Sequence, residues 1–164
     1  MSIAQSFLGE FDYEMANTRK VLERVPDDQF TFKPHEKSGE LGWLAAHVAN
    51  LPTWASLAIN GDNFDLASGE RAKTAANRAE LLELFDRNIV TAREAIAGAS
   101  DERLMGPWSL LREGKTLFTI PRAGVIRTWS LNHLIHHRAQ LTVYLRLVGV
   151  PVPALYGPTA DEAM

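Results

Sequence analysis

The chain has 164 residues, a formal net charge of −3 at pH 7 and no cysteine. This length favours a single domain, residues 1–164, that buries roughly two-thirds of the surface its unfolded chain would expose. The absence of cysteine excludes disulfides, Cys-ligated zinc and an internal thiol nucleophile. The acidic balance and the scattered basic residues lack the cationic cluster of a duplex-binding surface, so we expect no nucleic-acid partner.

The sequence predicts a protein that does not enter a membrane. Residues 1–14 have no basic leader and become acidic within about a dozen positions, unlike a signal peptide. No apolar run approaches the ~20 residues that a membrane-spanning helix needs. We therefore expect a cytoplasmic location.

The first part of the chain predicts two helices joined by a polar loop. Apolar residues at helical spacing favour an amphipathic helix from residue 3 to about residue 25, which the following proline ends. Residues 27–37 are polar and are predicted as a loop. A second helix is predicted over residues 38–60, with Ser38 as its N-cap. Pro52 should kink it, because proline removes one backbone hydrogen bond.

The second part predicts two further helices separated by a long crossover. An irregular link over residues 64–73 precedes a third helix over residues 77–98, which opens with a capping-box pattern. Residues 101–122 break the helical pattern and are predicted as a crossover with a small hairpin. A fourth helix follows over residues 123–148, closed by glycine and a pair of prolines. The expected fold is all-α, a four-helix bundle with a long crossover between helices 3 and 4.

Three of the protein's five histidines, His133, His136 and His137, fall within five residues of the fourth helix. His133 and His137 are four residues apart, so on a helix they share a face with Cβ atoms about 5–6 Å apart, close enough to hold one metal ion. Two nitrogens hold a metal poorly, so a third ligand is needed. The remaining candidates are His35, in the predicted polar loop, and His47.

His47 is the better third ligand because the pattern of the second helix turns it inward. Five apolar residues fall within about 60° of it on a helical wheel: Trp43, Leu44, Leu51, Trp54 and Ala58. The strip of the fourth helix that holds both His133 and His137 is mostly apolar as well. The two helices therefore direct their histidines into the same core.

Buried histidines can also form hydrogen bonds with neighbouring side chains and hold no metal. Three imidazoles meeting in a core would each leave an unsatisfied nitrogen, at a cost of about 1–3 kcal/mol each, and one divalent ion satisfies all of them. Three ligands leave a position open for water or substrate, as in catalytic sites. Zinc is the first candidate metal and nickel the second, because both suit imidazole.

Several further side chains are candidates for the surroundings of this site. His136 lies about 80° from the centre of the histidine strip, which places it at the rim as a pocket edge or as plain surface. Gln140 and Asn50 lie about one turn beyond His137 and His47 and can orient an imidazole or contact a substrate. The aromatic residues of the two helices could wall an apolar pocket or be ordinary core: Trp43, Trp54, Trp129 and Tyr144.

The opposite face of the fourth helix is also partly apolar. It carries Leu131, Ile135, Ala139 and Val143, where a monomer would present polar residues. A helix that is apolar on two faces is buried on two sides, and a homodimer is the simplest way to achieve this. We therefore expect a homodimer.

The stretch from His133 to Pro153 and the following Tyr156-Gly-Pro-Thr-Ala-Asp-Glu162 closely resemble the C-terminal signature of the DinB-like (DinB/YfiT) damage-inducible family. Gly42-Trp-Leu-Ala-Ala-His47 resembles the histidine segment of that family's second helix. The resemblance implies a four-helix bundle, often dimeric, with a divalent ion held by His47, His133 and His137. Some members resemble metal-dependent enzymes that use low-molecular-weight thiols such as bacillithiol or mycothiol.

These observations lead to one functional hypothesis and two alternatives. The first is a metal-dependent transferase in which a small thiol, as co-substrate, attacks an electrophile in the aromatic-lined pocket. The second is a metal-dependent hydrolase with bound hydroxide as nucleophile. The third is a non-catalytic stress-response protein whose metal stabilises the bundle. The sequence identifies no substrate and no general base.

Overall fold

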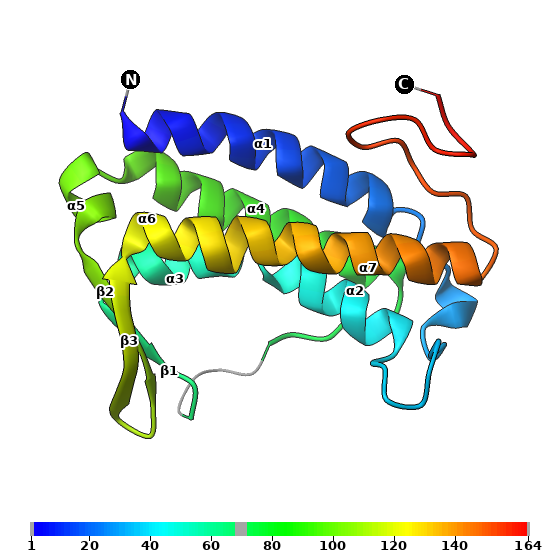
Figure 1. The fold of residues 1–164 in the computed structure, drawn as a ribbon, viewed down its shortest axis with the longest axis horizontal. Coiled ribbons are helices and arrows are strands. Elements are labelled where there is room, and N and C mark those ends of the chain that lie inside the picture. The colour runs from blue at the N-terminus through cyan, green and yellow to red at the C-terminus, as the bar shows by residue number, and fades with distance from the viewer. Residues whose placement is uncertain (1, 68–71, 164) are drawn as a thin grey trace.

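The computed structural model describes residues 2–67 and 72–163, which form a mostly helical fold with a three-stranded sheet at one end (Figure 1). The helical fold class is confirmed, and the sheet adds to it. Within the described ranges, none of the helices combines the length and the apolar character that a membrane crossing requires.

The long helices lie side by side, with the sheet projecting below them (Figure 1). The helices are α1 (Ile3–Leu22), α2 (Leu41–Asn50), α3 (Thr53–Asn60), α4 (Arg78–Gly98), α5 (Asp101–Met105), α6 (Arg122–Val125) and α7 (His133–Leu147). A 3-10 turn, η1 (Asp27–Gln29), follows α1, and a π-helical segment, η2 (Ile126–Asn132), joins α6 to α7. The strands are β1 (Asn63–Asp65), β2 (Pro107–Arg112) and β3 (Lys115–Pro121). Helix α4 packs against α1, α2 and α3, while α7 packs against α1 and α2.

The second predicted helix begins later than the sequence suggested, and Ser38 is not its N-cap. Glu40 occupies that position without a side-chain cap. The backbone N–H groups of Leu41 and Gly42 donate instead to the carbonyls of Phe32 and Phe30 in the preceding loop, at 2.9 Å each. These loop carbonyls satisfy the first donors of the helix, so no side-chain cap is required.

Pro52 divides the second predicted helix into α2 and α3, a stronger effect than the expected kink. The chain passes the break with bonds from Leu51 N–H to the Val48 carbonyl and from Trp54 N–H to the Leu51 carbonyl, both 3.3 Å long. A proline has no N–H and its ring displaces the carbonyl one turn earlier, so the α-helical ladder cannot continue through it. The break places His47 in the last turn of α2.

The crossover contains the predicted hairpin. Strands β2 and β3 pair antiparallel around a turn in which Glu113 (φ 53°) and Gly114 (φ 74°) both adopt positive φ, as a type I′ turn requires. The link predicted over residues 64–73 is wrong at its start, because β1 pairs in parallel with β2. Asp65 anchors β1 by accepting the Glu113 and Gly114 N–H groups at 3.0 and 2.7 Å, a long-range contact that local sequence does not reveal. Residues 68–71 of that link lie outside the described residues.

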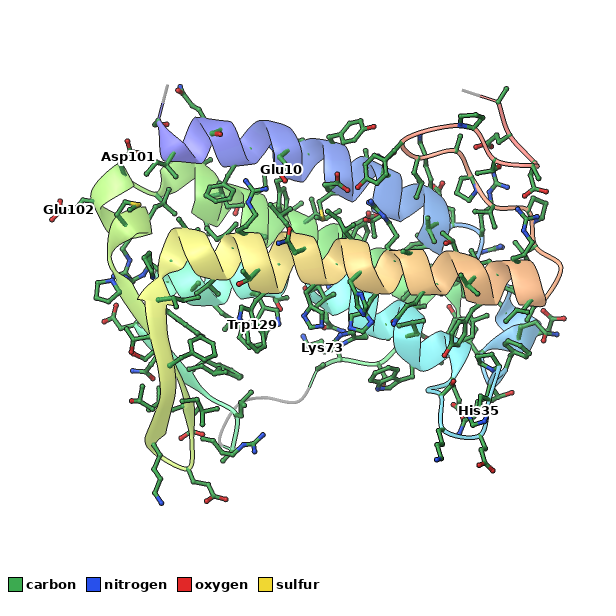
Figure 2. The ribbon with its side chains drawn as sticks, viewed as in Figure 1. Glu10, His35, Lys73, Asp101, Glu102 and Trp129 are labelled. Carbon is green, nitrogen blue, oxygen red and sulfur yellow. The ribbon has the colours of Figure 1, made fainter. Side chains whose placement is uncertain are left out.

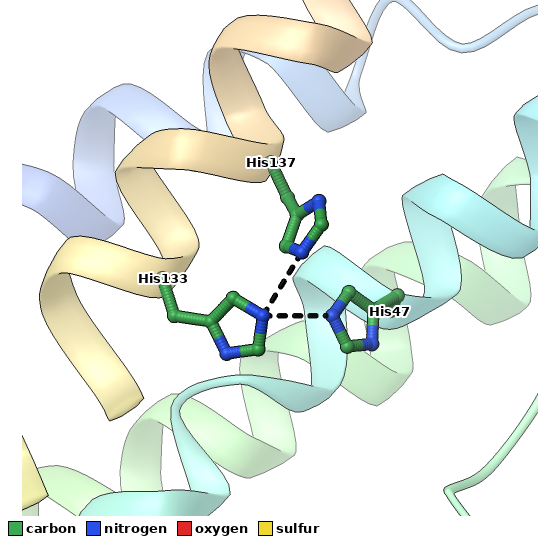
Figure 3. Close-up of side chains that lie close together, drawn as sticks. All are labelled: His47, His133 and His137. Carbon is green, nitrogen blue, oxygen red and sulfur yellow. Dashed lines mark hydrogen bonds between the residues drawn. The ribbon is translucent and has the colours of Figure 1, made fainter. Parts of the chain in front are cut away.

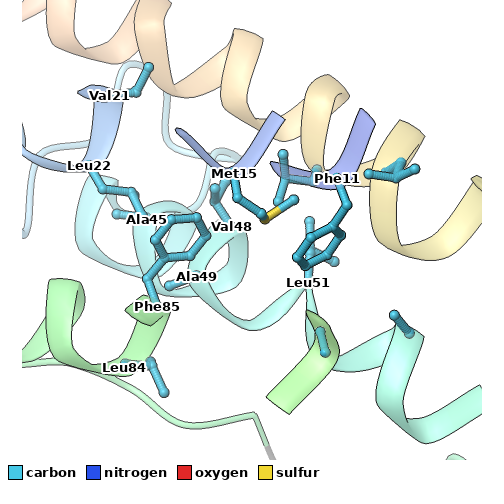
Figure 4. Packing of buried hydrophobic residues seen from close by; sticks show 14 of the residues in the cluster. Phe11, Met15, Val21, Leu22, Ala45, Val48, Ala49, Leu51, Leu84 and Phe85 are labelled. Atoms are coloured by element: carbon cyan, nitrogen blue, oxygen red, sulfur yellow. The ribbon is translucent and has the colours of Figure 1, made fainter. Parts of the chain in front are cut away.

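One hydrophobic core fills the space between the long helices. Phe11 and Met15 of α1, Leu51 after α2 and Phe85 of α4 meet there, and each is at most 3% exposed (Figure 4). A second, smaller cluster joins the sheet to the helices through Ala58, Trp108, Leu110 and Val125. Apolar burial on this scale is the main stabilising term of the fold.

The fourth predicted helix is present as α6, η2 and α7 in succession, and Gly149 (φ 77°) follows its last turn. Its second apolar face is only partly free. Leu131 is fully buried within the chain and Ile135 is half-buried, whereas Ala139 and Val143 are exposed. Part of the argument for a homodimer is therefore wrong, because the chain itself covers Leu131. The homodimer stays a prediction.

A buried charged cluster fixes the C-terminal segment, and the sequence did not reveal it. Arg138 of α7 is 1% exposed and Glu14 of α1 is 5% exposed. The Arg138 guanidinium contacts the Glu14 carboxylate at 2.7 Å and donates to the Thr18 hydroxyl at 3.0 Å. The Tyr156 hydroxyl donates to the same carboxylate at 2.7 Å. The cluster thereby joins α1, α7 and the chain that follows α7.

We predict that Arg138→Ala lowers the free energy of unfolding by about 3–5 kcal/mol, because it leaves the Glu14 carboxylate buried without its cation. Urea denaturation followed by circular dichroism measures the change. Arg146→Ala is the matched control, since Arg146 pairs with Asp161 at the exposed surface of the same helix and should cost far less. Equal losses in the two variants would contradict the assigned role of the buried cluster.

Candidate functional site

The structure brings His47, His133 and His137 together between α2 and α7 (Figure 3). The Nε2 atom of His133 lies 3.4 Å from Nε2 of His47 and 2.9 Å from Nε2 of His137. The ligand atoms of all three side chains lie within 4.8 Å of one another. We refer to these residues as the histidine triad. Each of its members is half-buried, so the cluster is partly sheltered and still reachable.

A hydrogen bond fixes the orientation of one ring in the triad. The Nδ1–H of His137 donates to Oε1 of Gln140 at 2.7 Å, because an amide oxygen can only accept. This tautomer leaves the lone pair of His137 on Nε2, directed at the other rings.

A π-helical segment directly precedes His133. The backbone N–H of His133 donates to the carbonyl of Thr128, five residues earlier, as in a π-helix, and also to that of Ser130. The α-helical pattern is therefore interrupted beside the first histidine of α7. Such local insertions are frequent at functional sites.

The surroundings keep two rings of the triad neutral near pH 7. Burial, followed by the proximity of His137 and His133, lowers the pKa of His47 to about 4. Burial and the neighbouring His137 and His136 also lower the pKa of His133, against the opposing effect of the Trp129 backbone. Neutral imidazoles are the form that binds metal.

The triad geometry suits a divalent cation better than it suits hydrogen bonding alone. An unprotonated imidazole nitrogen has one lone pair, and a protonated one has a single N–H. Nε2 of His133 therefore cannot satisfy both neighbours that lie within 3.4 Å of it. Ligand nitrogens about 2.0–2.1 Å from a tetrahedral ion are roughly 3.3 Å apart. The separation between His47 and His133, 3.4 Å, is close to that value, and that between His133 and His137, 2.9 Å, is somewhat shorter.

Gln140, His136 and Trp43 lie next to the triad, as the sequence suggested. Gln140 donates from its amide to Nε2 of His136 at 3.2 Å while accepting from His137, so it links the exposed His136 to the triad. The Trp43 indole stacks on the His47 ring, with centroids 5.4 Å apart and planes 2° from parallel. Trp43 is nevertheless 56% exposed.

Asn50 and Tyr144, also candidates from the sequence, make their hydrogen bonds away from the triad. The Asn50 amide donates to the carbonyls of Ala46 and Lys73, at 2.7 and 2.8 Å, and so ties the chain before α4 to α2. Tyr144 donates to the Gly39 carbonyl at 3.3 Å. His35, the rejected third ligand, lies in the exposed loop at one end of the molecule (Figure 2).

An aromatic wall extends from the triad toward the sheet. Trp129 lies edge-on to His133 at 6.2 Å and contacts Trp54 at 5.0 Å and Phe118 at 5.8 Å, measured between ring centroids. Phe64 of β1 continues the wall at 5.6 Å from Trp54. The sequence pattern indicated both tryptophans and neither phenylalanine. The alternation of Phe118 and Ile120 with polar residues in the hairpin was the available signal.

Two cavities lie near these elements. A groove of about 410 Å³ runs between the start of α2 and α7, and we call it the Trp43 groove. It is lined by Ser38, Gly39, Trp43, Leu44, Gln140, Val143 and Tyr144. A larger cavity, about 880 Å³, lies on the outer face of the sheet beside α5. There Arg103 and Arg122 both donate to the carbonyl of Gly61, at 3.1 Å each. Gly61 follows α3, so these bonds pair a carbonyl group at the C-terminal end of that helix.

Comparison with known proteins identifies the family. The model of the DinB family matches residues 1–164. The uncharacterised protein YrdA of Bacillus subtilis (strain 168) is 25% identical over 166 residues, which cover 95% of this chain and 89% of YrdA. A DinB-like protein from Bacillus cereus superposes with a TM-score of 0.74 at 23% identity, covering 94% of this chain and 98% of that one.

Two further solved structures share the fold. The DinB-like protein YjoA of Bacillus subtilis gives a TM-score of 0.71 at 18% identity, covering 92% of this chain and 97% of YjoA. A mycothiol-dependent maleylpyruvate isomerase gives 0.56 at 14% identity, covering 90% of this chain and 61% of the isomerase. The match of the family model along the whole sequence, together with these shared folds, shows that the chain belongs to the DinB family.

Proposed function

We propose that this protein binds a divalent metal ion, zinc or nickel, through His47, His133 and His137, and catalyses thiol-dependent transfer to a small electrophile. The observation that carries the proposal is the convergence of the Nε2 atoms in the triad. A divalent ion held there would act as a Lewis acid and lower the pKa of a thiol or water bound to it.

The protein's own residues support such a site in several ways. Gln140 holds the His137 ring in the tautomer that directs its lone pair inward, which is the usual role of a group hydrogen-bonded to a metal ligand. Three protein ligands leave a coordination position free, as in catalytic rather than structural zinc sites. The half-buried rings leave that position accessible to a small molecule.

The thiol part of the proposal draws on the mycothiol-dependent isomerase, which shares the fold at low identity. In the reaction we propose, the thiol loses its proton to solvent and its sulfur forms a bond to the electrophilic carbon. The leaving group departs with its bonding electrons and takes up a proton. Trp129 and the aromatic wall would bind an apolar electrophile beside His133. We place the reaction in the cytoplasm, where small thiols stay reduced.

We predict that the protein purified without chelators carries about one zinc or nickel ion per chain. His137→Ala should lose most of this metal, because two imidazoles bind weakly. His136→Ala is the matched control, since its side chain is exposed at the rim, and should retain the metal. Gln140→Leu should weaken affinity by about 10–100-fold. Elemental analysis and competition with a chromogenic chelator measure both effects, and full metal content in His137→Ala would refute the ligand set.

We also predict metal-dependent conjugation of a small thiol to monochlorobimane. Cysteine, mycothiol, bacillithiol and N-acetylcysteamine are offered in turn, and fluorescence reports the product. Activity should disappear on chelation, return with zinc or nickel, and be lost in a folded His47→Ala variant. No metal-dependent turnover with any thiol would argue against transfer, and thiol-independent cleavage of an aryl ester would instead favour a hydrolase.

We further propose that the chain forms a homodimer through the surface of α7 at the exposed Ala139, which does not line the Trp43 groove. Sedimentation velocity at micromolar concentration should then give the mass of two chains. Ala139→Arg, which places a charge at the centre of this face, should shift the protein toward the monomer. A wild-type protein that sediments as a monomer would exclude the dimer.

A further inference from the structure

The Trp43 groove adjoins the histidine triad through two of its lining residues. The Trp43 indole stacks on His47, and the Gln140 amide accepts from His137. A small molecule seated in the groove would therefore contact side chains that touch two of the three imidazoles. At about 410 Å³, the groove is large enough for a group of the size of a substituted ring.

The backbone of Gly39 helps to hold the indole of Trp43 in place. A Cβ atom built on Gly39 would lie 2.6 Å from Cε3 of Trp43, so the ring packs directly on the backbone of Gly39. The indole thus lies between the Gly39 backbone and the His47 ring, and the rest of its surface borders the groove. Trp43 and Val143, on opposite sides of the groove, nevertheless remain 56% and 58% exposed. Apolar and aromatic side chains that line one concave surface together with a few polar groups are typical of small-molecule sites.

The groove offers no charge to a ligand. Every residue that lines it is uncharged near neutral pH. A charged group would lose part of its hydration on entering and find no opposite charge, which is unfavourable. An uncharged ring packed against the exposed part of the indole and Val143 would bury apolar surface at little cost in desolvation.

The groove does offer neutral hydrogen-bonding groups at its edge. The Gln140 amide has two N–H donors, of which one reaches His136, so the other can donate to a ligand. The Tyr144 hydroxyl donates to the Gly39 carbonyl, which leaves its oxygen as an acceptor. These partners suit an amide or a hydroxyl group.

From this lining we infer that the Trp43 groove binds the non-reacting part of a substrate, and that this part is an uncharged group with a flat apolar face and an amide or hydroxyl. The inference extends the proposed function, because it assumes that chemistry occurs at the neighbouring triad. The group can belong to the thiol or to the electrophile, and both sources share this chemistry.

The direct test is an NMR titration of the full-length protein, as purified, after chelation and again after zinc loading. The probes are benzamide, benzenesulfonate and benzyltrimethylammonium, which share one ring and differ in charge. Benzamide should shift the indole N–H signal of Trp43, assigned with Trp43→Phe, and the side-chain amide signal of Gln140. Benzyltrimethylammonium should bind at least about tenfold more weakly, because the groove does not compensate its lost hydration, and benzenesulfonate should do so after chelation, when no bound cation attracts it.

A pair of variants on α7 tests the position of the site. Val143→Glu places a charge on the wall of the groove and should weaken benzamide binding, while Leu147→Glu is the matched control. Leu147 is equally exposed, at 58%, one turn further along the helix and outside the groove. Gly39→Ala should also weaken binding, because the added Cβ displaces the indole. Sedimentation of the variants checks that none of them acts by changing association.

A second assay identifies the source of the group. With monochlorobimane held constant, N-acetylcysteamine is compared with mercaptoacetate and cysteamine in the wild type and in Val143→Glu. A neutral-thiol preference that Val143→Glu removes assigns the groove to the thiol. An unchanged preference, alongside weakened benzamide binding, assigns it to the electrophile.

Four results would overturn the inference. The first three are equal binding of the three probes, signal shifts confined to Trp129 and the aromatic wall, and an unaltered benzamide affinity in Val143→Glu. The fourth is dissociation of a dimer by Val143→Glu, which would assign the groove to a second copy of the chain. Failure of the proposed function is distinguishable. If the protein takes up no zinc yet binds benzamide in the groove, the proposed metal chemistry is wrong and the proposed groove site stands.

Discussion

The Nε2 nitrogen of His133 faces the same atom of both His47 and His137, and it can satisfy only one of them by a hydrogen bond. This unmet hydrogen-bonding requirement among the three rings is the constraint on which the functional interpretation depends. The surrounding structure maintains it: burial keeps the rings of His47 and His133 neutral, and Gln140 fixes the tautomer of His137. A polypeptide that only needed to fill this space would do so at lower cost with apolar side chains.

The parts of the molecule that follow from local periodicity were predictable. The spacing of His133 and His137 fixes their shared helix face, and the apolar neighbours of His47 fix its inward direction, so their meeting needed only the packing of α2 on α7. The hairpin turn at Glu113 and Gly114 was also visible in the sequence. Each of these features depends on residues close together in the chain.

The features that sequence reasoning missed depend on long-range contacts. Strand β1 exists because Asp65 bonds to a turn almost fifty residues away. Arg138 looks like a surface residue in an amphipathic helix, and only the folded chain brings Glu14 and Tyr156 to it. The π-helical segment is likewise invisible to a pattern search at fixed helical period, although it directly precedes His133.

The aromatic wall combines side chains from the helices with side chains from the small sheet. Trp54 and Trp129 belong to the helices that carry the histidines, whereas Phe64 and Phe118 belong to the small sheet. No residue of the triad lies in that sheet. Evolution can therefore lengthen, shorten or rewrite the hairpin, and with it the shape of one side of the site, while the three imidazoles stay in place. A family that keeps its histidines and diversifies its substrates would gain from such a division.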